Sequence, residues 1–231
     1  MNNQFEFVDE NYKRIFSNVN EAKERYGRSD DSIEIMAVTK TVAPEIINHA
    51  VSSCGIKTLG ENRVQEYLSK KDFYLPASVH FIGQLQSNKV KYIIDSVDMI
   101  QSLDSLKLAA EINRHAQRIG KVQDVLAEVN IAGEEAKGGV SPDELYEFLS
   151  EVSLLSNIRV MGLMTVPPAA DSEKFLYKMQ ELYIDISNKK IDNINMSFLS
   201  MGMSGDYELA VKYGSNILRI GSALFGARVY R

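Results

Sequence analysis

Eight short runs rich in apolar and β-branched residues recur along the chain, each bounded by turn-forming residues. Runs of this length and composition are typical of strands buried on both faces, as in a parallel sheet. The predicted strands cover residues 33–39, 56–59, 79–83, 97–101, 122–131, 158–164, 194–200 and 217–225.

Between these runs, apolar residues recur at helical spacing. Helices are predicted at residues 44–53, which begin with a proline, at 106–119, which end before Gly120, and at 171–188. Ser141-Pro142 opens a further helix as an N-cap serine followed by proline. A helix over residues 9–26 precedes the first strand, and we expect it to close the floor of the fold.

Strict alternation of eight strands with helices favours a closed parallel barrel over an open doubly wound sheet. The alternative is an open flavodoxin-like or Rossmann-like sheet. Against it, the sequence has no G-x-G-x-x-G motif after the first predicted strand. We found no linker or internal repeat, and only six residues follow Phe225. The prediction is therefore a single α/β domain over residues 1–231, a (β/α)8 TIM-type barrel with one extra N-terminal helix.

The composition places this barrel in an ordinary soluble protein. Hydrophobic residues make up 45% and charged residues 25% of the 231 positions, and the net charge of −5 argues against nucleic-acid binding. Cys54 is the single cysteine, which fits a reducing compartment. The N-terminus lacks the features of a signal peptide, and no run has the length of a membrane span. We expect a cytoplasmic monomer that binds neither metal nor membrane.

Lys40 follows the apolar run of the first predicted strand. In β/α barrels the chemistry lies at the carboxyl ends of the strands, where this lysine falls. A desolvated lysine there has a lowered pKa and can form an imine with an aldehyde. The alternative is a lysine whose amine extends to solvent, and its position alone favours this alternative.

Two turns rich in glycine and serine follow the last two predicted strands. Residues 202–205 lead into a helix expected near Asp206, and Gly221-Ser222 follows the start of the eighth strand. Phosphate-binding barrels hold the anion between these two strand ends. Arg219 shares the strand face of Gly221, so its guanidinium points either at a ligand or into a salt bridge.

Six ordered segments resemble the pyridoxal phosphate homeostasis protein family, whose fold is that of the barrel domain of alanine racemase. The resemblance covers residues 33 to 231. The segments are Ala37-Val38-Thr39-Lys40, Gly60-Glu61-Asn62-Arg63-Val64-Gln65-Glu66, the run from His80 to Lys89, Gly162-Leu163-Met164-Thr165, Ser200-Met201-Gly202-Met203-Ser204, and the run from Arg219 to Gly226.

The resemblance implies a role for each matching residue. Lys40 would carry pyridoxal 5′-phosphate as a Schiff base. Ser204 with the adjoining backbone of Met203 would form one side of a phosphate site, and Gly221 with Ser222 the other. Arg219 would face the pyridine nitrogen, and Asn62 would make a polar contact near the cofactor. Thr39 and Ser222 differ from the family's common serine and threonine, and both substitutions keep a hydroxyl.

Three functions remain open from the sequence. The first is a carrier of pyridoxal phosphate that maintains vitamin B6 balance, with pyridoxal phosphate-dependent apo-enzymes as possible recipients and no established catalytic residue. The second is an amino-acid racemase or lyase using Lys40. The third is a phosphate-binding barrel enzyme or Schiff-base aldolase without this cofactor. An arginine at the ring nitrogen can only donate a hydrogen bond, which weakens the ring as an electron sink and favours the carrier.

Overall fold

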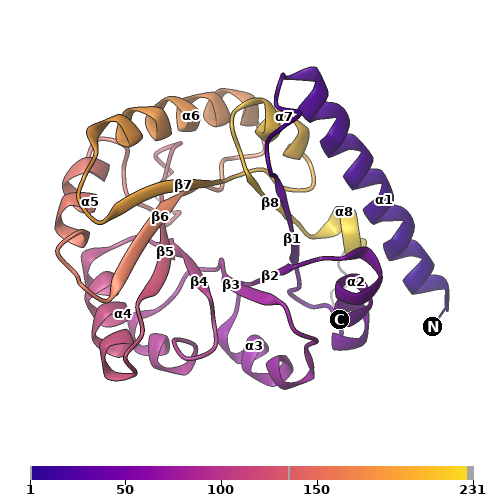
Figure 1. Cartoon of the computed structure of the whole chain (residues 1–231), viewed down its shortest axis with the longest axis horizontal. Coiled ribbons are helices and arrows are strands. Elements are labelled where there is room, and N and C mark those ends of the chain that lie inside the picture. Colours follow the sequence, from indigo (N-terminus) through magenta and orange to yellow (C-terminus); the bar gives the residue numbers. More distant parts are fainter. Residues whose placement is uncertain (1, 135, 228–231) are drawn as a thin grey trace.

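The computed structural model describes residues 2–134 and 136–227, and positions 1, 135 and 228–231 of the predicted domain lie outside this range. Eight parallel strands pair in sequence order and the eighth pairs with the first, so the sheet closes into a barrel. Helices surround the barrel on its outside (Figure 1). The predicted α/β barrel is therefore confirmed.

The elements follow the predicted order. The strands are β1 (Glu34–Val38), β2 (Thr58–Glu61), β3 (Ser78–Phe81), β4 (Met99–Leu103), β5 (Gln123–Glu128), β6 (Ile158–Met164), β7 (Ile194–Ser200) and β8 (Ile217–Ile220). The helices are α1 (Asn2–Arg25), α2 (Pro44–Cys54), α3 (Val64–Lys70), α4 (Leu106–Arg118), α5 (Leu145–Val152), α6 (Ser172–Lys189), α7 (Tyr207–Lys212) and α8 (Ser222–Phe225), with 3₁₀ turns η1 (Lys71–Phe73) and η2 (Ser87–Tyr92).

Two predicted strands are too long. The last one, predicted to reach Phe225, ends at Ile220, because Gly221 leaves the extended conformation and α8 begins at Ser222. The fifth, predicted to reach Ile131, ends at Glu128, since the Asn130 side chain bonds the backbone of Glu134 and turns the chain. Apolar side chains continue past both strand ends, and this continuation made the predicted strands too long.

Helix α1 lies on the flank of the barrel and not across its floor, which corrects the prediction (Figure 1). It packs between α7 and α2 and against α8, through a buried stripe at Val8, Ile15, Val19 and Ala22. The Asn11 amide donates to the Leu224 carbonyl at 3.1 Å. Helix α8 is a single turn and is too short to shield the outer face of β8 and β1 from solvent, so α1 adds to the helical layer there.

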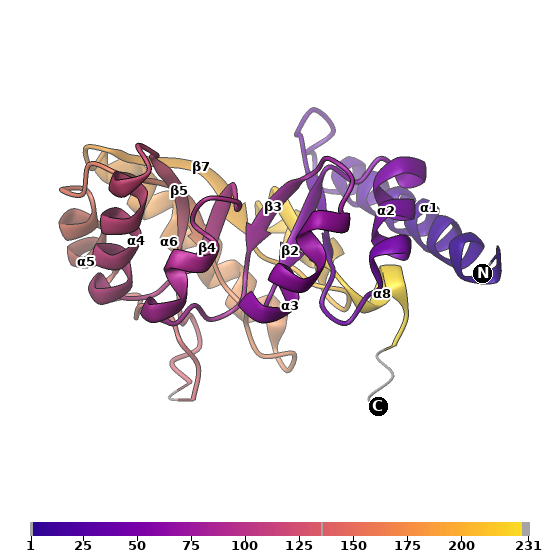
Figure 2. The same ribbon diagram turned by 90° about the horizontal axis from the view of Figure 1, so that it is seen from below.

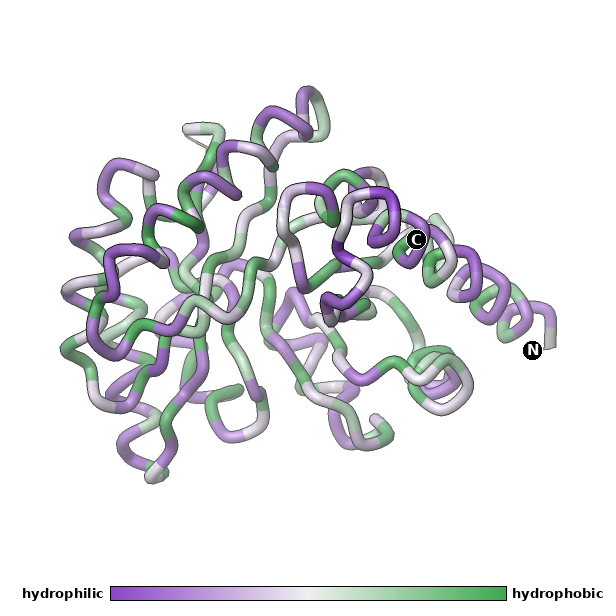
Figure 3. The backbone as a smooth tube through the Cα atoms, turned by 45° about the horizontal axis from the view of Figure 1, so that its top comes forward, coloured by the Kyte–Doolittle hydropathy of each residue, from purple (hydrophilic) through white to green (hydrophobic). Residues whose placement is uncertain are grey.

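Hydrophobic and hydrophilic stretches alternate along the chain (Figure 3). The pairing of β1 with β8 places Met36 opposite Arg219 and Ala37 opposite Ile220. This register brings the segment after Val38 beside the segment after Ile220. Residues 129–134 and 136–140 of the loop after β5 extend from one side of the molecule, and α8 lies towards the same side (Figure 2). None of the helices in the described ranges has the length and apolar character needed to cross a membrane.

Candidate functional site

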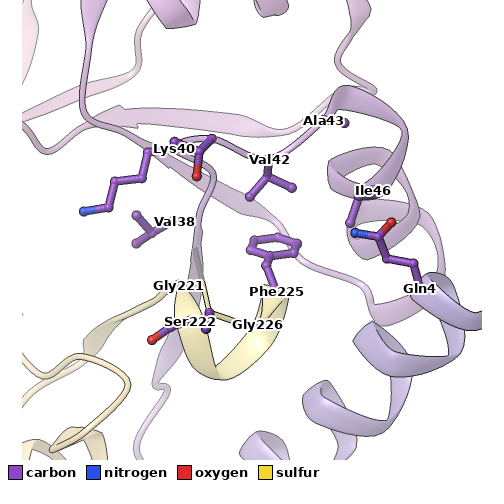
Figure 4. Close-up of a pocket in the computed structure, with 12 residues that line it drawn as sticks. Gln4, Val38, Lys40, Val42, Ala43, Ile46, Gly221, Ser222, Phe225 and Gly226 are labelled. Atoms are coloured by element: carbon purple, nitrogen blue, oxygen red, sulfur yellow. The ribbon is translucent and has the colours of Figure 1, made fainter. Parts of the chain in front are cut away.

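A cavity of about 570 Å³ opens at the carboxyl ends of β1 and β8. Its volume lies in the range of small-molecule sites. The described residues that line it are Gln4, Val38, Lys40, Thr41, Val42, Ala43, Ile46, Gly221, Ser222, Phe225, Gly226 and Ala227. The Lys40 amine and the Ser222 hydroxyl lie on one side of it, and the side chains of Val42, Ile46 and Phe225 on the other (Figure 4).

The turn after β7 is hydrogen-bonded to the turn after β8, which lines this cavity. The Ser204 hydroxyl accepts a hydrogen bond from the Ala223 N–H at 3.0 Å, although the two residues belong to different turns. Gly221 lies against Val38, since a Cβ added to the glycine would be 3.5 Å from the Val38 Cβ. Three residues of the predicted anion site, Lys40, Gly221 and Ser222, therefore line one cavity, and Ser204 is linked to it by the hydrogen bond from Ala223.

The backbone of Met203 makes a hydrogen bond within its own turn. Its N–H donates to the Asp206 carboxylate at 2.7 Å, so that this donor is used inside its own turn. Gly202, just before it, has φ +90° and packs so closely that an added Cβ would be 2.4 Å from the Ala210 Cβ. Because α7 and α8 are only one to two turns long, an anion here would be held mainly by individual donors and by Lys40.

Arg219 lies inside the barrel and is buried. Its guanidinium donates from Nη1 to the Ser200 hydroxyl and from Nη2 to the Thr165 carbonyl, both at 2.7 Å. No carboxylate in the described part of the chain is within ion-pair distance of it. Burial lowers the pKa of Arg219 to about 10, so the side chain still carries its proton at neutral pH. The salt-bridge alternative is therefore wrong.

The hydrogen bonds continue across the barrel interior. The Ser200 hydroxyl donates to Gln101 Oε1 at 2.7 Å, and the Gln101 amide lies 3.0 Å from His80 Nδ1. Burial lowers the pKa of His80, which keeps the ring neutral and its Nδ1 able to accept. These linked hydrogen bonds restrict the orientation of the Arg219 guanidinium.

Asn62 follows β2 and has a buried side-chain acceptor. Within the described residues, its Oδ1 is buried and has no hydrogen-bond partner. Its backbone is pressed against Gly83, where an added Cβ would be 2.1 Å from the Asn62 carbonyl oxygen. A buried polar atom without a partner costs stability, and a ligand donor would remove that cost.

Glu128 interacts electrostatically with Arg219, and the sequence patterns did not single it out. It ends β5, and burial together with the nearby charge of Asp104 raises its pKa to about 7, while Arg219 acts to lower it. The predicted strand ran on to Ile131 and so placed Asn130 at the barrel mouth. Glu128 is an acidic residue inside the predicted strand, and this could have pointed to it. Because the strand was predicted to end at Ile131, Glu128 was not recognised as a strand-end residue.

Residues 11–229 match the family model of the alanine racemase N-terminal domain. The pyridoxal phosphate homeostasis protein of Aquifex aeolicus is 43% identical over 227 residues, which are 96% of this chain and 98% of that protein. The chain therefore belongs to the alanine racemase N-terminal domain family and, within it, to the pyridoxal phosphate homeostasis proteins.

Solved structures agree with this assignment. A protein of unknown function from Bifidobacterium adolescentis is 31% identical, with a TM-score of 0.92 over 97% of both chains. PipY of Synechococcus elongatus PCC7942, solved with PLP bound, is 28% identical, with a TM-score of 0.77 over 90% of this chain and all of PipY.

The residues present fit pyridoxal phosphate. The Lys40 amine and the Ser222 hydroxyl line one cavity, and Ser204 is linked to its wall through Ala223. A buried arginine lies in the barrel interior, and Asn62 Oδ1 lacks a partner among the described residues. An aldehyde, a phosphate and a heterocycle with hydrogen-bonding groups require donors and an amine of this kind.

The raised pKa of Glu128 predicts a pH-dependent stability. The folded protein holds this proton up to about pH 7, whereas the unfolded chain releases it near pH 4.5. Stability conferred by the protonated form is thus present below pH 4.5 and is lost as the pH rises towards 7. The side chain of the Glu128→Gln variant stays neutral at every pH. Between pH 5 and 8 the unfolding free energy of the variant should therefore fall less than that of the wild type, by on the order of 2 kcal/mol.

Urea denaturation of both proteins at several pH values measures this difference. Parallel profiles for wild type and Glu128→Gln would show that the carboxyl does not titrate as its surroundings imply.

Proposed function

We propose that this protein binds pyridoxal 5′-phosphate as a Schiff base on Lys40 and acts in intracellular vitamin B6 homeostasis. The observation that carries the proposal is the shared cavity of Lys40, Gly221 and Ser222, joined by Ser204 through its hydrogen bond with Ala223. In this arrangement the amine can react with the aldehyde and the hydroxyl groups can bind the phosphate of one small molecule.

Each residue then has a role set by its chemistry. Ser204, Gly221 and Ser222 hold the phosphate, with the turn at Met203 shaping one side. Arg219 donates to the ring nitrogen, and Asn62 accepts from a polar group near the cofactor. When bound, the cofactor supplies an aldehyde carbon for an amine and a ring that withdraws electrons. Lys40 supplies that amine from the end of β1.

The relatives support this assignment. Pyridoxal phosphate homeostasis proteins match this chain over nearly their entire length, and PipY has been solved with PLP bound. A barrel aldolase without this cofactor has no such support.

Several features favour holding the cofactor over catalysing a reaction with it. Among the described residues lining the cavity, only Lys40 has an ionisable side chain. Racemisation requires an acid or base on each face of the substrate carbon. An arginine at the ring nitrogen leaves that nitrogen unprotonated, so the ring stabilises a carbanion weakly. A racemase or lyase remains the second candidate, favoured by the family's shared barrel.

A homeostatic role would make pyridoxal phosphate-dependent apo-enzymes the recipients of the released cofactor. The single cysteine supports placing this role in the reducing cytoplasm. We further propose that the protein acts as a monomer, as expected from its sequence.

The Schiff base should be visible. Wild-type protein incubated with pyridoxal phosphate should turn yellow, with an absorption band that borohydride bleaches, and Lys40→Ala should lack this band because no amine remains at that position. Lys71→Ala, which removes another lysine, should remain yellow. A wild-type protein that stays colourless would contradict both the carrier and the racemase.

Exchange of the α-hydrogen separates these two candidates. Amino acids incubated in heavy water with the loaded protein should exchange at close to the rate with free cofactor, because a second base is lacking in the described cavity. Exchange at enzyme-like rates that depended on Lys40 would establish the racemase or lyase instead.

An acidic side chain in the phosphate site should expel the cofactor. Ser204→Asp and Gly221→Asp place a negative charge against the phosphate, and we expect cofactor affinity to fall at least tenfold with little loss of stability, since the space at Gly221 admits a Cβ. Ser156→Asp makes the same change at an exposed site before β6, at the other end of the barrel. Equilibrium dialysis that found all variants equal would show the phosphate to lie elsewhere.

A further inference from the structure

The backbone on both sides of Lys40 is held by side chains of α3. The Lys70 ammonium donates to the Thr39 carbonyl at 3.1 Å, and the Thr41 N–H donates to the Glu66 carboxylate at 2.5 Å. These two contacts flank Lys40 directly in the chain. Residues 60–66 form one of the segments that resemble the family. The proposed function assigns no role to Glu66.

The turn that carries Lys40 needs such support. Thr41 has φ +64°, in the left-handed region that β-branched residues rarely adopt. A backbone of this kind persists only where surrounding contacts hold it, and it is typical of functional sites. The hydrogen bond from the strained residue's own N–H to a carboxylate is charge-assisted and therefore strong.

Glu66 and Lys70 also bind each other. Their side chains form an ion pair of 2.5 Å one helical turn apart, with exposed fractions of only 19% and 12%. Burial acts to raise the pKa of Glu66, but the hydrogen bonds from Lys70 and Thr41 outweigh it and lower the pKa, so the carboxylate is charged. One rigid pair thus reaches both neighbours of Lys40.

The Thr39 side chain is fixed as well. Its hydroxyl donates to Glu61 at 2.7 Å, and Tyr74 donates to the same carboxylate oxygen. Glu61 is fully buried at the end of β2. Rotation of the peptide segment around Lys40 is therefore limited by β2 on one side and by α3 on the other.

We propose that Glu66 and Lys70 are positioning residues, which fix the turn at residues 39–41 so that the Lys40 amine is aimed at the aldehyde. The proposal rests on the proposed function of Lys40. Attack on a carbonyl requires the amine at a defined distance and direction, and freedom in the supporting backbone reduces the fraction of productive conformers. The pair acts through Lys40 and does not need to touch the cofactor.

The first measurement requires no cofactor. In Glu66→Ala the Thr41 amide loses its acceptor, so amide hydrogen exchange in the peptide covering residues 39–43 should accelerate at least tenfold. Glu173→Ala removes the carboxylate from a comparable lysine pair, which it forms with Lys212 at 2.7 Å, and should leave this peptide unchanged. Unchanged exchange in Glu66→Ala would overturn the proposal.

The second measurement separates positioning from binding. Stopped-flow absorbance should show Schiff-base formation about tenfold slower in Glu66→Ala and Lys70→Ala than in wild type, equivalent to about 1.4 kcal/mol. Lys70→Arg, which keeps the charge and donors, should stay within about threefold of wild type. The affinity for pyridoxine 5′-phosphate, whose alcohol cannot form a Schiff base, should change less than twofold in all variants.

The outcomes are distinct. If the variants lose Schiff-base rate and pyridoxine 5′-phosphate affinity equally, the pair has only a structural role and the proposal is overturned. Schiff-base rates equal to that of the wild type would also overturn it. A wild-type protein that forms no Schiff base at all would instead overturn the proposed function, and this inference with it.

Discussion

The pairing of β8 with β1 is the constraint on which the site depends. Only closure of the barrel brings the end of the first strand beside the turn that follows the last one, with Ala37 in register with Ile220. Lys40 and Ser222 lie far apart in the sequence, yet they line one cavity because these two strands are neighbours. Helix α1 covers the same junction from outside, so the covering helix and the site depend on the same strand pairing.

Hydrogen bonds in the barrel interior hold the side chain of Arg219 in place. The guanidinium of Arg219 is bonded to Ser200 and to the Thr165 carbonyl, and the bonds continue through Gln101 to His80. A buried cation without a paired carboxylate is costly, and its hydrogen bonds to neutral oxygens offset part of that cost. A fixed donor of this kind suits holding a heterocycle in one orientation. In this account Lys40 is a tether for the cofactor more than a catalyst.

Much of the architecture could be predicted because strand and helix periodicity are local properties. The order of eight strands and the convergence of Lys40 with Gly221 and Ser222 follow from local pattern and barrel geometry. The end of β8 could not be predicted, since Leu224 is as buried in α8 as it would be in a strand. The contact between Glu66 and the Lys40 turn also escaped prediction, because partners from separate elements are set only by the assembled fold.

The most direct test of the account is to identify the residue that carries the cofactor. The protein would be incubated with pyridoxal phosphate, reduced with borohydride, digested, and analysed by tandem mass spectrometry. The account predicts a single dominant modified peptide with the reduced cofactor on Lys40. Modification centred on another lysine, or spread over the surface lysines with Lys40 unmodified, would contradict it.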